Sequence, residues 1–224
     1  MKRGNNFDLA RLLLATLVVF FHAAMLSEHP RLLFLHRLDA RGAVEGFFVI
    51  SGFLIFASYE RSRSLRDYFV KRARRILPGY WFATLLCLAI AAGYGRLFRA
   101  GKFLIGNLTF LGFISPGIPG VFESNPENAA MNGALWTIKI EVLFYCAVPV
   151  LVFLCRRFRP ILVLSACIAA SLAWRAALAR HSSLSLQLPG QLSYFSLGAL
   201  AYYYRPAFHR IAKWIWAPAL LLYI

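Results

Sequence analysis

The chain has 224 residues, of which 60% are hydrophobic, and it carries 25 lysines and arginines against 9 aspartates and glutamates. So few polar side chains could not cover the surface of an ordinary soluble domain. The composition therefore excludes a protein of that class. The excess of positive charge indicates that the cations lie in cytoplasmic loops, where they attract anionic lipid head groups. We therefore expect no nucleic-acid partner. We predict an all-α polytopic bundle of about six to seven transmembrane helices, forming one membrane-embedded domain over residues 1–224.

The first predicted span, residues 7–26, carries a cation near one end and a histidine near the other. At about 100° per residue, Arg11 and His22 return to nearly the same helix face, roughly 16 Å apart along the axis. Ionisable groups inside a membrane are costly and are functional candidates by default. His22 is therefore a candidate acid–base residue, the alternative being a packing histidine, and Arg11 suits an anionic ligand or reaches to lipid head groups.

The second predicted span, about 43–59, is rich in glycine and phenylalanine. Glu45 lies near its outer end, and Ser51 and Gly52 lie in its middle. Small residues allow helices to approach closely, so helix packing is the alternative to a functional role here. Ser51 is not part of a Gly-x-Ser-x-Gly nucleophile elbow.

The most basic stretch of the chain follows, with Arg61, Arg63, Arg66, Lys71, Arg72, Arg74 and Arg75. A capping box at Ser64 and Asp67 predicts an interfacial helix, and Pro78 predicts the start of a third span, about 78–95. Arg72 and Arg75 are three residues apart and share a helical face, which suits a phosphorylated ligand. The alternative is a topogenic cluster of positive charge at the membrane surface.

The remaining segments are predicted from hydropathy. The run 103–113 is too short to cross a bilayer and is interpreted as interfacial or re-entrant, and a long polar segment follows it. Further spans are predicted at about 134–154, 160–179 and 189–204, with a seventh beginning near Trp214. The chain ends inside an apolar run, which predicts the N-terminal portion of a longer protein.

The fourth span holds three further candidates. Glu141 lies about two turns in from the polar loop and is a candidate general base or partner of a histidine. Its alternative role is an ion pair with an arginine on another helix. Trp136 and Tyr145 are candidate ligand-binding residues, or else interfacial and packing aromatics. The four cysteines lie in or beside apolar runs, without metal-ligand spacing, so we predict buried free thiols and no metal site.

The cations predict the orientation of the chain. With the N-terminus inside, the inner segments carry about twice as many cations as the outer ones, as the positive-inside rule requires. The inner set includes Lys2, Arg3, Arg205, Arg210 and Lys213.

Four ordered segments between residues 7 and 155 match a known pattern. They are FDLARLLLATLVVFFH, with ten residues between Arg11 and His22; GAVEGFFVISGFLIF, with Glu45 where aspartate is usual; KRARRILPGYW; and LWTIKIEVLFYCAVP. Together they resemble acyltransferase family 3, the integral-membrane O-acyltransferases, mostly bacterial, that modify surface and secreted glycans.

The resemblance implies an enzyme that moves an acyl group from a cytoplasmic donor, commonly acetyl-CoA, to a hydroxyl of a carbohydrate or lipid-linked glycan. It implies no bound cofactor, acyl-CoA as co-substrate, and a multi-pass protein of the inner cell membrane. It points to His22 as the catalytic histidine and places Glu141 in another motif. Arg11, Arg72 and Arg75 face the donor, and the remaining candidates for substrate or donor binding are Glu45, Ser51, Trp136 and Tyr145.

Two alternatives stay open at this stage. A proton-coupled transporter would also use membrane-embedded His, Glu and Arg, but it predicts two matching halves, and the sequence has no such repeat. An inactive, truncated membrane remnant is the other alternative, because the chain is shorter than a typical family member.

Overall fold

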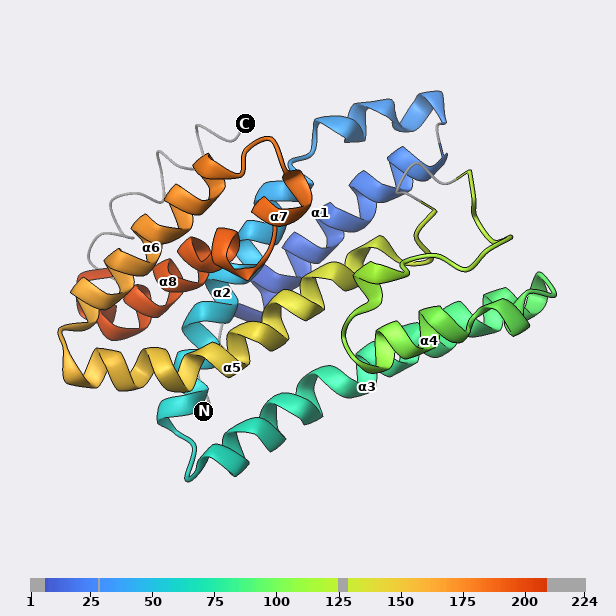
Figure 1. The fold of residues 1–224 in the computed structure, drawn as a ribbon. Coiled ribbons are helices and arrows are strands. Elements are labelled where there is room, and N and C mark those ends of the chain that lie inside the picture. Colours follow the sequence, from blue (N-terminus) through green and yellow to red (C-terminus); the bar gives the residue numbers. More distant parts are fainter. Residues whose placement is uncertain (1–6, 28, 125–128, 209–224) are drawn as a thin grey trace. The chain divides into compact units, whose positions relative to one another are not determined.

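The computed structural model describes residues 7–27, 29–124 and 129–208, and it is helical over most of these residues (Figure 1). The described residues contain no named β-strand, only an isolated antiparallel bridge between Ile118 and Val121. The predicted all-α class is therefore confirmed. Lys2, Arg3 and the predicted seventh span near Trp214 lie outside the described residues.

Five of the described helices are long and apolar enough to cross a membrane, judged by length and composition. They are α1 (Phe7–Ser27), α2 (Ala40–Glu60), α3 (Leu65–Gly93), α5 (Trp136–Arg157) and α6 (Pro160–Ala177). α8 (Leu188–Tyr203) corresponds to the predicted sixth span, but its 16 residues fall short of the roughly 20 that a perpendicular span needs.

The connections contain short helical elements. These are η1 (Pro30–Arg37), η2 (Leu97–Arg99), α4 (Gly101–Leu108), η3 (Gly112–Ile114), η4 (Gly133–Leu135) and α7 (Ser182–Ser185). α4 occupies much of the run 103–113 and has only 8 residues, so it is too short to cross a bilayer, in agreement with the prediction. Its interfacial or re-entrant character stays a prediction.

The basic stretch and the third span form one helix, α3, of 29 residues, with Pro78 inside it. The prediction that Pro78 opens a new span is therefore wrong. A proline inside a helix removes one hydrogen bond and costs roughly 3 kcal/mol, but ending the helix there would leave several backbone groups without partners in an apolar environment. The helix starts at the predicted cap, where the Asp67 backbone N–H donates to Ser64 Oγ at 3.1 Å.

Large apolar side chains remain exposed along the long helices. On α1, Leu12, Leu13 and Val19 each expose 61% or more of their surface, and on α3 Phe82 exposes 70%. In water such a surface would promote aggregation, whereas in a bilayer it faces lipid chains. The exposed apolar faces are therefore those of a membrane protein.

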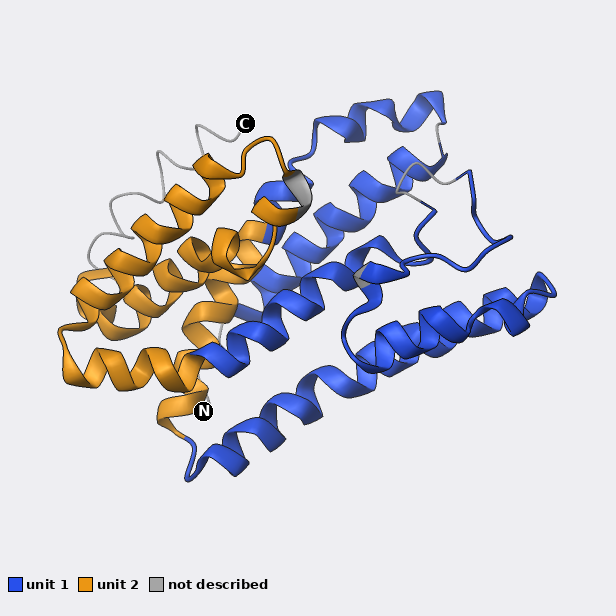
Figure 2. Cartoon of the chain, in the orientation of Figure 1, with its two compact units in different colours: residues 1–44, 62–147 blue, residues 45–61, 148–224 orange. Residues whose placement is uncertain are grey.

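Two compact units divide the chain (Figure 2). Unit 1 comprises residues 1–44 and 62–147, and unit 2 comprises residues 45–61 and 148–224. α2 and α5 each contribute residues to both units. The prediction of one domain over residues 1–224 concerns the family domain and stays a prediction.

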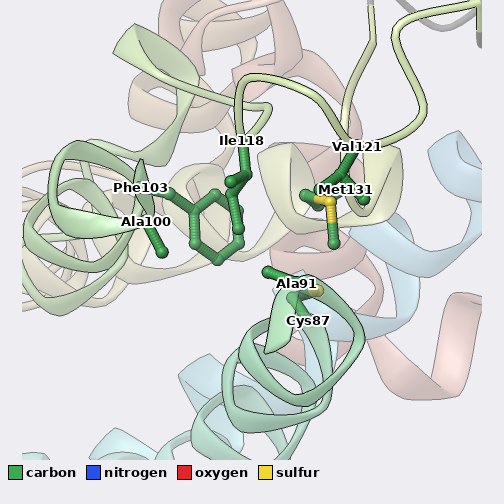
Figure 3. Close-up of a cluster of buried hydrophobic side chains, with 7 residues drawn as sticks. All are labelled: Cys87, Ala91, Ala100, Phe103, Ile118, Val121 and Met131. Carbon is green, nitrogen blue, oxygen red and sulfur yellow. The ribbon is translucent and has the colours of Figure 1, made fainter. Parts of the chain in front are cut away.

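In unit 1, α4 and the loop that follows it pack on the end of α3. Figure 3 shows their shared apolar cluster, whose buried side chains are Cys87, Ala91, Ala100, Phe103, Ile118, Val121 and Met131. Ile118 and Val121 belong to the segment 114–133 that was predicted only as polar, and they are 2% and 1% exposed. This loop is thus anchored by apolar side chains, although Asn125, Pro126 and Asn128 lie outside the described residues.

A buried polar contact supports the same packing. The Tyr80 hydroxyl is 2.9 Å from the Asn107 backbone oxygen and 3.0 Å from Asn107 Oδ1. Asn107 Nδ2 donates to the Phe103 carbonyl at 2.8 Å, and the Tyr80 ring stacks on Phe110 at 5.0 Å. Because the buried amide is hydrogen-bonded on both sides, it fixes the position of α4 on α3 without an unsatisfied polar group.

In unit 2, α8 packs closely against both α2 and α6. The Phe48 and Phe195 rings stack at 4.8 Å, and the Ser193 backbone N–H donates to Ser171 Oγ at 3.0 Å. A Cβ atom on Gly52 would collide with the backbone carbonyl of Phe195, and one on Gly198 would collide with the carbonyl of Val49. Glycine at these two positions therefore permits the close approach of α2 and α8.

We expect Gly52→Ala to lower the free energy of unfolding by about 1–3 kcal/mol, because the colliding atoms are backbone and cannot move aside. Gly79→Ala is the matched control, since a Cβ there meets nothing within 4 Å. The control should leave stability unchanged or raise it by up to about 1 kcal/mol through helix propensity. Thermal unfolding of the full chain in detergent measures both, and equal melting temperatures for the two variants would contradict the packing.

Candidate functional site

The predicted site residues are divided between the two units. Unit 1 contains most of them: Arg11, His22, Arg72, Arg75, Trp136, Glu141 and Tyr145. Unit 2 contains Glu45 and Ser51. Each group is described within its own unit.

His22 is half-buried in α1 and has a defined tautomer. Its Nδ1 lies 2.8 Å from the Val18 carbonyl oxygen, one helical turn earlier. A carbonyl oxygen only accepts hydrogen bonds, so in the neutral imidazole this contact places the proton on Nδ1 and the lone pair on Nε2. The imidazole is thus oriented by the backbone, and Nε2 is the nitrogen that could accept a proton or attack a carbonyl carbon.

Arg11 lies on the same side of α1 as His22, as the spacing predicted. Both side chains are half-buried, whereas Leu12, Leu13 and Val19 form the exposed side of the helix. The two ionisable residues therefore avoid the face with the most exposed apolar side chains. This placement fits the rule that ionisable groups in membrane helices face protein or a wet cavity.

A second group of polar side chains joins α3 to α5. The Tyr145 hydroxyl donates to Glu141 Oε1 at 2.7 Å, and the Arg72 guanidinium lies over the Tyr145 ring at 5.7 Å from its centroid. The fully buried Tyr68 donates its hydroxyl to the Tyr145 backbone oxygen at 3.2 Å. A guanidinium, a phenol and a carboxylate are thus held together, and we call Arg72, Tyr145 and Glu141 the α3–α5 cluster.

The two arginines that are predicted to bind the donor, Arg72 and Arg75, lie in different environments. Arg72 is half-buried in the α3–α5 cluster, while Arg75 is exposed. Both nevertheless lie within electrostatic range of the Tyr145 hydroxyl.

Trp136, the first residue of α5, is half-buried. In the part of the chain that the structure describes, no direct hydrogen bond joins His22 to Glu141, so the assistance of His22 by Glu141 stays a prediction.

The residues of unit 2 include partners that the sequence did not single out. Glu45 pairs with Arg175 at 3.6 Å, and Arg175 also hydrogen-bonds the hydroxyl of Tyr194. Arg175 was a recognisable signal, because it is a cation within the predicted fifth span. Tyr194 and Tyr68 carried no such signal, since a tyrosine in an apolar run is common.

Ser51 is 6% exposed and precedes Gly52 at the contact between α2 and α8. This position supports helix packing as the role of the Ser51–Gly52 pair.

Two of the four cysteines, Cys87 and Cys155, are buried as predicted, but Cys146 is exposed. Among the described residues, no group of three or more His, Cys, Asp or Glu side chains could hold a metal ion.

Comparison with known proteins decides the family. A family model described as an acyltransferase domain, that of acyltransferase family 3, matches residues 5–224. The chain belongs to acyltransferase family 3. The match confirms the resemblance of the four segments and extends it past residue 155, where the sequence had offered only compatible hydropathy. With its membrane-length helices, this member of acyltransferase family 3 is a multi-pass membrane protein.

Three curated relatives are similar to this family member. Nodulation protein 10 of Rhizobium leguminosarum bv. viciae is 31% identical over 93% of this chain and 61% of its own length. The O-acetyl transferase of Shigella phage Sf6 is 35% identical over 65% of this chain and 45% of its own. The exopolysaccharide production protein ExoZ of Rhizobium meliloti is 31% identical over 63% and 41%. The chain thus spans less than two thirds of each relative, and no solved structure matches it.

Proposed function

We propose that the protein is a membrane-bound O-acyltransferase that moves an acyl group, in particular acetyl, from a cytoplasmic acyl-CoA to a hydroxyl of a cell-surface or secreted carbohydrate. The proposal includes an inner-membrane location with the N-terminus in the cytoplasm. Family membership supports acyl transfer, and the names of two relatives, an O-acetyl transferase and an exopolysaccharide production protein, support the acetyl group and the carbohydrate acceptor.

The observation that carries the proposal is the orientation of His22. With Nδ1–H on the Val18 carbonyl, Nε2 is available as the base. In the proposed reaction Nε2 takes the proton from the acceptor hydroxyl while the oxygen attacks the thioester carbonyl. The carbon–sulfur bond then breaks, the coenzyme A thiolate leaves, and it receives the proton from the imidazolium.

Positive charge in unit 1 suits the donor. Coenzyme A carries phosphates, and Arg11, Arg72 and Arg75 are the guanidinium groups that we assign to them. The half-buried position of Arg72 and its stacking on Tyr145 support a fixed orientation for one of these groups. Through Tyr145, a donor bound at Arg72 would also influence Glu141, whose Oε1 accepts from the Tyr145 hydroxyl.

A covalent route is the rival mechanism. Nε2 would attack the thioester itself, form an acyl-histidine and release coenzyme A, and the acceptor hydroxyl would then displace the imidazole. Acid quenching followed by mass spectrometry of the His22 peptide distinguishes the two routes. A mass increase of one acetyl group on His22, lost on addition of acceptor, would contradict direct transfer.

The function itself is tested with membranes that contain the full chain, radiolabelled acetyl-CoA, and alkali-deacetylated bacterial exopolysaccharide as acceptor. We expect label in the polysaccharide above the level of membranes without the protein, and release of that label as acetate by mild alkali, because an O-acetyl ester is alkali-labile. Absence of label with several such polysaccharides would contradict the proposal and favour an inactive remnant.

A further inference from the structure

Unit 2 contains a polar cluster of residues that the proposed reaction does not use. It consists of Glu45 from α2, Arg175 from α6 and Tyr194 from α8, and we call it the α2–α6–α8 cluster. Arg175 forms an ion pair with Glu45 at 3.6 Å, hydrogen-bonds the Tyr194 hydroxyl, and lies 5.3 Å from the centre of the Tyr194 ring. Glu45 also interacts electrostatically with Tyr194. Arg175 thus bridges the carboxylate and the phenol, and the three side chains lie together.

The local structure around Arg175 holds this arrangement in place. The Trp174 indole N–H donates to the Leu184 carbonyl at 3.1 Å, which ties α7 to the last turn of α6. A Cβ atom on Gly190 would collide with the Ser185 carbonyl oxygen, and it would touch Arg175 Cγ. Glycine at position 190 therefore lets the first turn of α8 approach the backbone of α7, next to the arginine.

The cluster is accessible rather than sealed. The side chains of Arg175 and Glu45 keep 25% and 24% of their surface exposed. Glu45 lies in the second turn of α2, Arg175 in the last turn of α6 and Tyr194 in the second turn of α8. The three contacts bring these helix ends together at one end of unit 2, the end that the distribution of cations predicts to face outward. A ligand arriving from the outer side would therefore reach the cluster.

The chemistry of the cluster selects among ligand classes. An anionic ligand would be repelled by Glu45, and a cationic ligand would be repelled by Arg175. A neutral polyhydroxyl compound meets neither cost, because each hydroxyl both donates and accepts hydrogen bonds. A guanidinium, a carboxylate and a phenol side by side offer donors and acceptors of matching kinds, and the two charged groups strengthen those bonds.

We propose that Glu45, Arg175 and Tyr194 form a saccharide-binding subsite, which takes an uncharged sugar residue of the acceptor glycan. The proposal rests on the proposed function in one respect, namely that the acceptor is a carbohydrate. A polymeric acceptor has many sugar residues, so the residue held here need not be the one that receives the acyl group. The competing explanation is an ion pair that only locks α2, α6 and α8 together.

Kinetics with the full chain in membranes distinguish the two explanations, with radiolabelled acetyl-CoA and alkali-deacetylated exopolysaccharide as the probes. For Arg175→Ala and Glu45→Gln, we expect KM for the polysaccharide to rise about tenfold or more, as for a lost charged hydrogen bond, with KM for acetyl-CoA unchanged. The matched control is Arg180→Ala, an exposed arginine five residues further along, which should leave both constants unchanged.

A charge exchange tests the lock directly. The double variant Glu45→Arg with Arg175→Glu keeps an ion pair but presents it in reverse, so we expect its KM for the polysaccharide to stay raised. If the exchange restores both the melting temperature and that KM, the cluster is a lock and the subsite is ruled out. Tyr194→Phe, which keeps the ring and removes only the hydroxyl, provides a second test if the charged variants fail to fold.

Direct binding separates a failure of this inference from a failure of the proposed function. Purified full chain in detergent is titrated with the deacetylated polysaccharide, and binding is followed without any acyl donor. Binding by the wild type that is lost in Glu45→Gln and Tyr194→Phe supports the subsite, even if no acyl transfer is measured. Equal binding by wild type and variants, or no binding by the wild type, overturns it.

Discussion

Replacing His22 with alanine is expected to lower the turnover number of acyl transfer by about 10²–10⁴-fold, the usual contribution of a positioned general base. The reason is the fixed tautomer, because the Val18 carbonyl holds the proton on Nδ1 and leaves Nε2 as the proton acceptor. KM for acetyl-CoA should change little, since in the proposed reaction the imidazole acts on the reacting atoms rather than on the donor's phosphates. Initial rates with radiolabelled acetyl-CoA at saturating polysaccharide measure the effect.

Two further substitutions at this position separate geometry from chemistry. The amide of His22→Asn lies near the position of Nδ1, and that of His22→Gln lies near the position of Nε2. Neither amide takes up a proton near neutral pH, so both variants should be as inactive as the alanine variant even where they reproduce a hydrogen bond. A variant that recovers a tenth or more of the activity would show that His22 acts by orientation alone.

The matched control for His22 is Thr16→Ala. Thr16 Oγ1 donates to the Leu12 carbonyl at 2.9 Å, the same one-turn contact between side chain and backbone, but on the exposed side of α1. Each of these contacts contributes on the order of 1 kcal/mol to stability, so the two alanine variants should melt alike. Thr16→Ala should retain full activity, and a comparable loss in it would assign the His22 effect to helix stability.

Hydropathy predicted the spans well because it is a local sum over residues in one segment. The predicted spans 7–26, 43–59 and 160–179 correspond closely to α1, α2 and α6. It failed at Pro78, where the rule for helix starts competes with the need to satisfy backbone groups in an apolar environment. Which of the two effects dominates depends on the environment of the helix around Pro78, and the neighbouring residues in the sequence do not reveal that environment.

The candidate site was predictable where charge made it conspicuous. His22, Arg11 and Glu141 interrupt apolar runs, so their cost alone identified them. The contacts that organise the site were not predictable, since they join distant positions: Tyr68 meets Tyr145 across 77 residues of sequence. Periodicity predicts the face on which a residue lies, but not the partner that the face meets.

The same limit applies to the loop after α4. Its many proline, glycine and asparagine residues predicted an irregular polar segment, which is correct for the backbone. Ile118 and Val121 are nevertheless buried against the side chains of Cys87 and Ala91 of α3 and Phe103 of α4 (Figure 3). Two apolar residues in a polar stretch carry little weight in a hydropathy average, yet they are sufficient to anchor the loop.

Removing the Tyr145 hydroxyl is expected to have the second largest effect on activity. Tyr145→Phe leaves Glu141 Oε1 without its 2.7 Å hydrogen bond and keeps the ring that Arg72 covers. A half-buried carboxylate that loses its hydrogen-bond donor is no longer held in place, and we expect kcat/KM to fall about 10–100-fold. Glu141→Gln should cause a loss of similar size, because it weakens the same hydrogen bond from the other side.

A double-mutant cycle tests whether these two residues act as one unit. If they act only through their shared hydrogen bond, the variant with both Tyr145→Phe and Glu141→Gln should be no worse than the more damaged single variant. Losses that multiply would mean that the two residues contribute separately. That result would contradict a role of their shared hydrogen bond in activity.

Arg72 distinguishes a role in donor binding from a role in the chemical step. Arg72→Lys keeps the positive charge but removes the planar group that stacks on Tyr145, so KM for acetyl-CoA should rise while turnover stays nearly constant. Arg74→Ala, an exposed arginine of the same helix, is the control and should leave KM unchanged. If the Arg74 and Arg72 variants raise KM for acetyl-CoA equally, the basic stretch acts as diffuse surface charge, and the specific assignment of Arg72 is wrong.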